Sequence, residues 1–169
     1  MIEALLQQFG LAHDDLYQVN GPVNLVRLMQ VLDQIDRPDL KYPAFVPTLP
    51  RELAGRRDIF EAIRKSDILL HHPYQSFAPV VSFIERAAND PQVVAIKQTV
   101  YRTGAQSEMM ELLMQAARNG KAVTVVVELM ARFDEEANIN WAQRLEDAGA
   151  HVIYGVVGHK THAKMALVV

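Results

Sequence analysis

The residues best suited to chemistry in this chain are His162 and Lys164, which flank Ala163 just before the apolar run Met165 to Val169. Side chains alternate along an extended strand, so an H-x-K triplet there directs an imidazole and an ammonium to the same side. Neutral imidazole is a nucleophile near pH 7 and can carry a phosphoryl group. A neighbouring ammonium can hold the phosphate oxygens. The triplet therefore indicates phosphoryl transfer.

Two arginines stand at comparable places in the chain. Arg102 follows a Val- and Ile-rich stretch over 92–101, and Arg132 follows the apolar stretch 122–129. Arg102, Arg132 and His162 are about 30 residues apart, roughly the length of one strand–helix repeat. Ligands of α/β sheets gather at the carboxyl ends of strands, so adjacent repeats could bring all three side chains to one rim. Taken alone, Arg102 and Arg132 could be solvated ion-pair formers, as arginines at strand ends often are. An isolated H-x-K triplet could likewise occur by chance.

The remaining histidines are weaker candidates. His71 and His72 precede a proline, and adjacent strand residues face opposite ways, so the pair is a poor metal site and fits a turn. His151 begins a predicted strand and is interpreted as structural. His159 and Lys160 precede the triplet, where they would add positive charge.

The elements that must position these residues begin near residue 55, where strand and helix patterns alternate. Strands are predicted over 67–71, 92–101, 122–129, 151–156 and 164–169. Helices are predicted between them, with apolar faces at 80–87, 110–117 and 139–145, and Ser76 is the predicted N-cap of the first. This alternation implies right-handed crossovers and a mostly parallel sheet with flanking helices. The predicted fold class is therefore α/β.

The first part of the chain has a different character. Apolar residues at helical spacing begin at Ile2 and again at Leu25, and Asp15 to Val19 is predicted to be a short strand between them. Four of the eight prolines fall between residues 38 and 50. Because proline favours extended backbone, the segment 38–54 is predicted to be a linker or an extended arm between domains.

Composition restricts the class of protein. Of the 169 residues, 50% are hydrophobic and 22% are charged, which is typical of globular chains. The net charge of −3 gives no overall attraction to nucleic acid, so an anion site must be local. The absence of cysteine excludes disulfides and thiolate zinc sites. No apolar stretch approaches the roughly 20 residues of a membrane span, and the N-terminus lacks signal-peptide features, so a cytoplasmic location is expected.

Four segments taken together resemble the bacterial polyphosphate kinases that phosphorylate a histidine. The segments are 67–77 (DILLHHPYQSF), 96–104 (IKQTVYRTG), 127–140 (VELMARFDEEANIN) and 160–165 (KTHAKM). They occur in the family's order and spacing. The resemblance covers essentially the whole chain and is strongest over residues 55–169.

The resemblance implies a domain organisation. The family's enzyme is far longer than this chain and has a helical domain, a head domain and two C-terminal domains that resemble phospholipase D. Residues 1–50 would be the end of the head domain, a short α+β segment with a proline-rich linker. Residues 51–169 would be the first part of the first phospholipase-D-like domain. The chain is thus expected to be an internal fragment with an incomplete domain, and alone it is expected to have little or no kinase activity.

The resemblance also implies an activity, the reversible transfer of the terminal phosphate of ATP to inorganic polyphosphate through a phosphohistidine. By the motif match, His162 would be phosphorylated, and Lys164, Arg102 and Arg132 would bind phosphate. The family associates both arginines with Mg²⁺, and because arginine has no acceptor atom we expect them to hold phosphate oxygens that the metal also binds. ATP or ADP and polyphosphate are the implied substrates. The full-length enzyme is expected to be a homo-oligomer without a nucleic-acid partner or a transmembrane segment.

Two other functions remain open. A phosphodiesterase or nuclease of the phospholipase D superfamily would pair one H-x-K half-site with another across a dimer. In those enzymes, four residues separate the lysine of H-x-K from a following aspartate. This chain has Val169 at the aspartate position, which favours the kinase. The third candidate is a non-catalytic polyphosphate-binding module, because the expected site is only half present and the last strand is predicted to be an exposed sheet edge.

Overall fold

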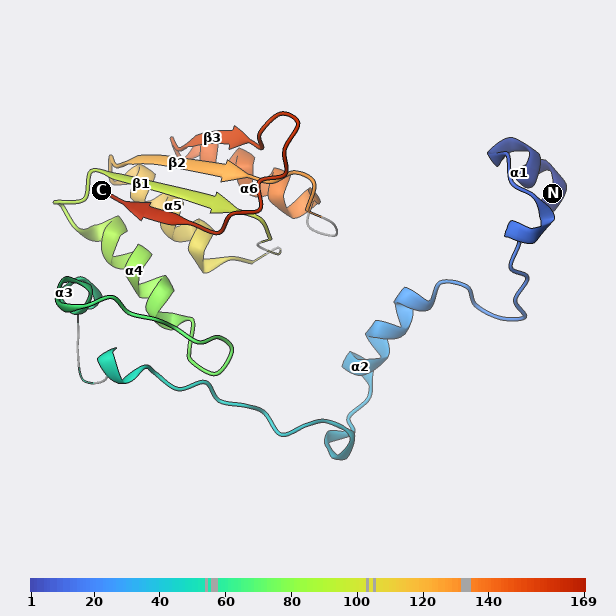
Figure 1. The fold of residues 1–169 in the computed structure, drawn as a ribbon, viewed down its shortest axis with the longest axis horizontal. Coiled ribbons are helices and arrows are strands. Elements are labelled where there is room, and N and C mark those ends of the chain that lie inside the picture. The colour runs from blue at the N-terminus through green and yellow to red at the C-terminus, as the bar shows by residue number, and fades with distance from the viewer. Residues whose placement is uncertain (54, 56–57, 103, 105, 132–134) are drawn as a thin grey trace. The chain divides into compact units, whose positions relative to one another are not determined.

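The computed structural model of this chain describes residues 1–53, 55, 58–102, 104, 106–131 and 135–169. It divides into two compact units, Met1–Phe45 and Val46–Val169 (Figure 1). The second unit has a mixed α/β fold with a mostly parallel sheet, which confirms the fold class predicted from the alternating strand and helix patterns.

The first unit consists of short helical elements. These are α1 (Ile2–Phe9), α2 (Val31–Gln34) and 3₁₀ turns at His13–Asp15, Leu25–Gln30 and Pro38–Leu40. Helix α1 ends at Gly10, whose φ of 63° lies in the left-handed region that glycine adopts without strain. The strand predicted over Asp15 to Val19 is wrong. The carboxylate of Asp15 instead accepts the N–H of Ala12 at 2.9 Å and closes a turn.

The second unit is built on a sheet that has four strands in the described part of the chain. These are β1 (Ala95–Val100), β2 (Ala122–Val127), β3 (His151–Tyr154) and β4 (Ala166–Val168), in the spatial order β3-β2-β1-β4 (Figure 1). Strands β1, β2 and β3 run parallel, whereas β4 runs antiparallel to β1. Each strand lies inside a segment predicted to be a strand and is shorter than predicted.

The helices of this unit are α3 (Ile59–Lys65), α4 (Ala78–Asn89), α5 (Glu108–Arg118) and α6 (Glu135–Asp147). Val123, Val125 and Val127 of β2 are buried and belong to one apolar core with side chains of α4, α5 and α6. The N-cap of α4 is Phe77, one residue after the predicted Ser76, and the hydroxyl of Ser76 accepts the N–H of Ala78. Within the described ranges, no helix combines the length and the apolar character needed to cross a membrane.

The strand predicted over 67–71 is wrong, because the structure assigns no strand to these residues. Ile68 and Leu70 instead line a cavity together with residues of α3 and α4. Helix α3 itself was not predicted. Its sequence signal is Asp58, an N-cap residue directly before the apolar pair Ile59 and Phe60.

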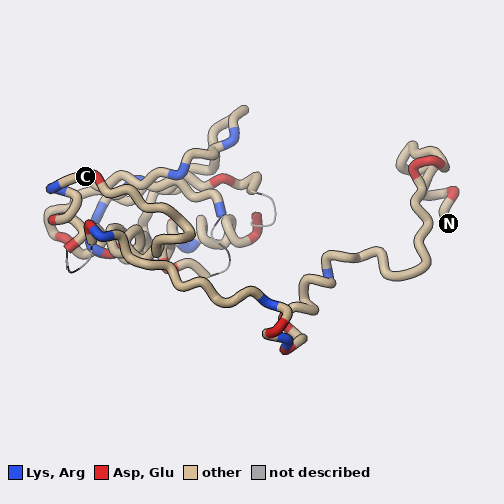
Figure 2. Tube along the Cα trace, turned by 60° about the horizontal axis from the view of Figure 1, so that its bottom comes forward, with Lys and Arg blue, Asp and Glu red and all other residues tan. Residues whose placement is uncertain are grey.

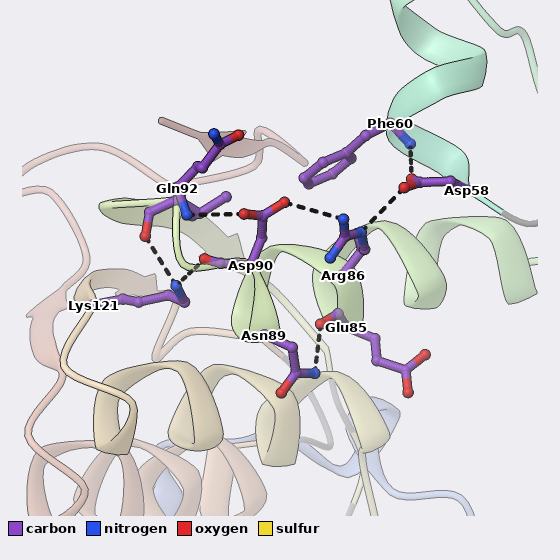
Figure 3. Close-up of polar contacts among 9 residues, drawn as sticks. Asp58, Phe60, Glu85, Arg86, Asn89, Asp90, Gln92 and Lys121 are labelled. Atoms are coloured by element: carbon purple, nitrogen blue, oxygen red, sulfur yellow. Dashed lines mark hydrogen bonds and ion pairs between the residues drawn. The ribbon is translucent and has the colours of Figure 1, made fainter.

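A polar network connects α3 to α4 and to the turn before β1 (Figure 3). The carboxylate of Asp58 caps α3 by accepting the N–H of Phe60 at 2.8 Å. The guanidinium of Arg86 lies 3.4 Å from the carboxylates of both Asp58 and Asp90. The ammonium of Lys121 donates to the carbonyl of Asp90 at 2.5 Å. The network therefore fixes the position of α3 through one carboxylate, Asp58.

We expect Asp58→Ala to lower the melting temperature of the protein by a few degrees at pH 7, because the helix loses its cap. The N–H of Phe60 and then the charge of Arg86 hold the pKa of Asp58 below its usual value, although burial opposes this. The resulting stability is present above about pH 4 and is lost as the pH falls through the lowered pKa. Thermal melts at pH 7 and pH 3 measure both effects.

Asp58→Asn is the matched control, because asparagine also caps helices but carries no charge. This variant should melt between Asp58→Ala and the parent at pH 7, and close to the parent at pH 3. If Asp58→Ala melted at the parent's temperature at pH 7, the cap would contribute nothing.

Candidate functional site

His162 and Lys164 lie in the segment that leads into β4. The prediction placed Lys164 inside the last strand, but β4 begins two residues later at Ala166. Both side chains are exposed, and the ammonium of Lys164 donates to the carbonyl of His162 at 2.7 Å. The triplet therefore stands where the chain enters the sheet, with both side chains accessible to a ligand.

Tyr101, the residue after β1, is the centre of a cluster of cations. The ring of His162 packs edge-on against the Tyr101 ring, with centroids 4.8 Å apart and an interplanar angle of 81°. The ammonium groups of Lys164 and Lys160 lie 4.1 and 5.3 Å from the Tyr101 centroid, and the guanidinium carbon of Arg102 lies 5.4 Å from it. Aromatic faces attract cations through their quadrupole. One ring thus gathers an imidazole and three cations at the carboxyl end of β1.

A buried asparagine fixes the strand ends beneath this cluster. Asn138 of α6 is fully buried, and its amide donates to the carbonyls of Tyr101 and Glu128, both at 2.9 Å. These carbonyls directly follow β1 and β2, so one side chain links the two strand ends. Buried polar groups are normally satisfied in this way. The backbone of Tyr101 consequently has a defined position.

Glu128 directly follows β2, and the residue is only 3% exposed. One carboxylate oxygen accepts the N–H of Met130 at 2.8 Å, and the other accepts the N–H of Thr161 at 2.6 Å. Thr161 directly precedes His162. The carboxylate therefore connects the end of β2 to the segment that carries the candidate nucleophile.

The structure brings two of the three evenly spaced residues to one place. Arg102 and His162 both contact the ring of Tyr101, at the carboxyl end of a parallel strand. Arg132, the third, lies outside the described residues. Along the described chain, basic and acidic residues are interspersed (Figure 2).

The other histidines occupy positions that fit their structural interpretation. His72 and its proline form a turn in which a ring nitrogen of His72 lies 2.9 Å from the carbonyl oxygen of Gln75. The ring of His71 packs against Tyr74. His151 begins β3 as predicted.

A cavity of about 480 Å³ adjoins the cluster. Its walls come from β1, from the start of β4 and the residues before it, and from α4 and α5. Tyr101, Arg102 and Lys164 contribute to these walls, as do Phe77 and Ser107. A bound molecule could therefore contact the cations from this cavity.

The described residues around His162 offer a poor donor set for a magnesium ion. Magnesium prefers oxygen ligands, and lysine and arginine side chains have no acceptor atom. Both carboxylate oxygens of Glu128 already accept backbone N–H groups. In the described part of the chain, no group of three His, Asp or Glu side chains could hold a metal. Direct coordination of magnesium by these residues is therefore not supported.

Four residues that contact this site were not singled out from the sequence, namely Tyr101, Glu128, Asn138 and Thr99, whose hydroxyl donates to the carbonyl of Ala163. All four lie inside the segments that carry the family resemblance. Glu128 also has a local signal, because it is the acid within the apolar stretch 122–129. The contacts of the other three depend on the tertiary fold.

Comparisons with known proteins agree in one family. Residues 58–169 match the sequence profile described as polyphosphate kinase C-terminal domain 1. Over 169 residues the chain is 61% identical to the polyphosphate kinases of Burkholderia multivorans and Burkholderia vietnamiensis, and 60% identical to that of Paraburkholderia phytofirmans. It covers 25% of the length of each. The crystal structure of polyphosphate kinase from Porphyromonas gingivalis matches 99% of the chain with a TM-score of 0.75 and 30% identity, and the chain covers 25% of that structure's chain.

Proposed function

The chain belongs to the polyphosphate kinase family, and we propose that His162 accepts the terminal phosphoryl group of ATP and passes it to inorganic polyphosphate. One observation carries this proposal. A histidine and three cations meet at the ring of Tyr101, inside the residues that match the family profile. The reverse transfer, from polyphosphate to ADP, uses the same groups.

In the proposed first step, a neutral imidazole nitrogen of His162 attacks the γ-phosphorus of ATP. The N–P bond forms, the bond to the bridging oxygen breaks, and ADP leaves with that oxygen. Negative charge spreads over the three equatorial oxygens, and catalysis depends mainly on positioning and charge stabilisation. Lys160, Lys164 and Arg102 supply the positive charge. The guanidinium of Arg102 can also bind two phosphate oxygens at once.

In the second step, a terminal oxygen of polyphosphate attacks the phosphorus held on His162. The N–P bond breaks, the imidazole is regenerated, and the polyphosphate chain is one phosphate longer. Arg132 is proposed to bind phosphate with Arg102 in both steps. A magnesium ion would neutralise phosphate charge while held by phosphate oxygens and water, and the two arginines would contact the same phosphates.

The chain spans a quarter of the length of its curated relatives, and we propose that it works as one segment of a longer enzyme. The complete active site would then include residues from other segments. The isolated chain is accordingly predicted to have little or no activity. A homo-oligomeric state and a cytoplasmic location also remain predictions.

Labelling of the full-length enzyme with ATP that carries ³²P at the γ-phosphate tests the proposed function. We expect a label that acid removes and alkali does not, as for phosphohistidine, together with labelled polyphosphate. ATP labelled at the α-phosphate should leave no label. Cleavage of phosphodiesters without enzyme labelling would instead favour the phosphodiesterase. Polyphosphate binding without labelling would favour a non-catalytic module.

A further inference from the structure

The backbone on both sides of His162 is held by two side chains, one in β1 and one directly after the end of β2. On one side, the carboxylate of Glu128 accepts the N–H of Thr161 at 2.6 Å. On the other side, the hydroxyl of Thr99 in β1 donates to the carbonyl of Ala163 at 2.8 Å and accepts the N–H of Met165 at 2.9 Å. We call Thr99 and Glu128 the backbone clamp.

The clamp adds to one backbone hydrogen bond, from the N–H of Thr99 to the carbonyl of Met165 at 3.0 Å. His162 lies outside the strands, and β4, which follows, is only three residues long. The side chains of His162 and Lys164 are exposed, so burial does not fix them. Hydrogen bonds to the backbone on either side of His162 therefore restrict where its imidazole can be.

The choice of residue at position 99 suggests a role beyond the strand. Neighbouring β2 has valine at positions 123, 125, 126 and 127. Valine favours strands as threonine does, so the strand itself does not require threonine at position 99. The hydroxyl of threonine can also donate to one backbone group and accept from another, whereas valine can do neither. Glu128 shows a similar feature, since a buried carboxylate is costly unless its oxygens are hydrogen-bonded. Both of its oxygens are bonded to backbone N–H groups.

We propose that Thr99 and Glu128 are positioning residues for phosphoryl transfer, which act by fixing the backbone around His162 so that its imidazole stays against Tyr101. This inference rests on the proposed role of His162 as nucleophile. Group transfer is sensitive to position, and a displacement of about 1 Å can lower a rate about 100-fold. The hydrogen bonds of Thr99 and Glu128 described above all go to backbone groups, so the clamp acts through the backbone.

The hydroxyl is tested with Thr99→Val and Thr99→Ser in the full-length enzyme. Valine keeps the shape of threonine and suits a strand, whereas serine keeps the hydroxyl. We expect Thr99→Val to slow single-turnover formation of phosphohistidine about 10- to 100-fold, with the Kd for ATP changed less than about 3-fold. Thr99→Ser should recover the parent rate to within about 3-fold.

The carboxylate is tested with Glu128→Gln, with Glu85→Gln as the matched control on the exposed side of α4. Glutamine has one acceptor oxygen, so it can serve only one of the two N–H groups that Glu128 binds. We expect Glu128→Gln to slow phosphohistidine formation about 10-fold and Glu85→Gln to leave it unchanged. Hydrogen exchange, followed by mass spectrometry, should be faster in peptides covering 161–165 for both Glu128→Gln and Thr99→Val.

The outcomes separate this inference from the proposed function. Faster exchange in 161–165 together with slower transfer supports the clamp. The inference is overturned if hydrogen exchange in 161–165 is unchanged, or if Thr99→Val forms phosphohistidine at the parent rate. It is also overturned if Thr99→Ser slows this step as much as Thr99→Val does. A loss of ATP affinity equal to the loss of rate would also overturn it, because the residues would then act on binding. If the parent enzyme forms no phosphohistidine, the proposed function is wrong, and the inference about Thr99 and Glu128 is wrong with it. If only the inference about the clamp is wrong, the parent enzyme is still labelled.

Discussion

A full-length enzyme carrying His162→Ala is expected to form no detectable phosphoenzyme from ATP, a loss on the order of 10⁴-fold or more. Alanine removes the nitrogen that would bind the phosphoryl group, and the three cations around Tyr101 cannot replace it. Rapid quenching at alkaline pH after incubation with γ-labelled ATP measures the loss.

His151→Ala is the control for this substitution. His151 is also an exposed histidine of the second unit. It begins β3, whereas His162 is the histidine that packs against Tyr101. The variant should keep at least about half of the parent's labelling, because exposed substitutions rarely disturb folding. Equal losses in the two variants would mean that the nucleophile is wrongly assigned.

Arg102→Ala is expected to lower the rate of phosphoryl transfer about 100- to 1,000-fold and to leave the melting temperature nearly unchanged. Arg102 is exposed, its guanidinium carbon lies 5.4 Å from the Tyr101 centroid, and we propose that it binds phosphate oxygens there. Removal of one preorganised charge weakens the transition state, whereas an exposed side chain contributes little to folding. Single-turnover kinetics and a thermal melt measure the two quantities.

Two further variants make this prediction specific. Arg102→Lys keeps the charge but loses the planar guanidinium that can bind two phosphate oxygens. Its transfer rate should therefore lie between those of the parent and Arg102→Ala. Arg118→Ala removes an exposed arginine at the end of α5 and should change neither quantity. A normal transfer rate in Arg102→Ala, or a loss explained by unfolding, would refute a phosphate-binding role.

The sheet was predictable because its strands have strong local signals. Val- and Ile-rich stretches separated by helical apolar faces indicated β1, β2 and β3 and their parallel arrangement. The segment 67–71 has the same short apolar pattern, yet it forms no strand, and Ile68 and Leu70 line a cavity with residues of α3 and α4. A short apolar run does not reveal whether it packs in a sheet or under helices.

The candidate site was predictable in its residue types and only partly in its geometry. The H-x-K triplet and the spaced arginines pointed to His162 and Arg102, which meet at Tyr101. The clamp was not predictable, because Thr99 and Ala163 are 64 residues apart and meet only through the antiparallel pairing of β4 with β1. Local patterns carry no information about such pairing.

The most direct test of the account is to locate the phosphoryl group on the enzyme. The full-length protein is incubated with ATP, quenched and digested at neutral or alkaline pH, and its peptides are mapped by tandem mass spectrometry. The account predicts a phosphoryl group on the imidazole of His162, and its disappearance when polyphosphate or ADP is added. A phosphoryl group on another residue, or polyphosphate synthesis without any phosphorylated His162, would contradict it.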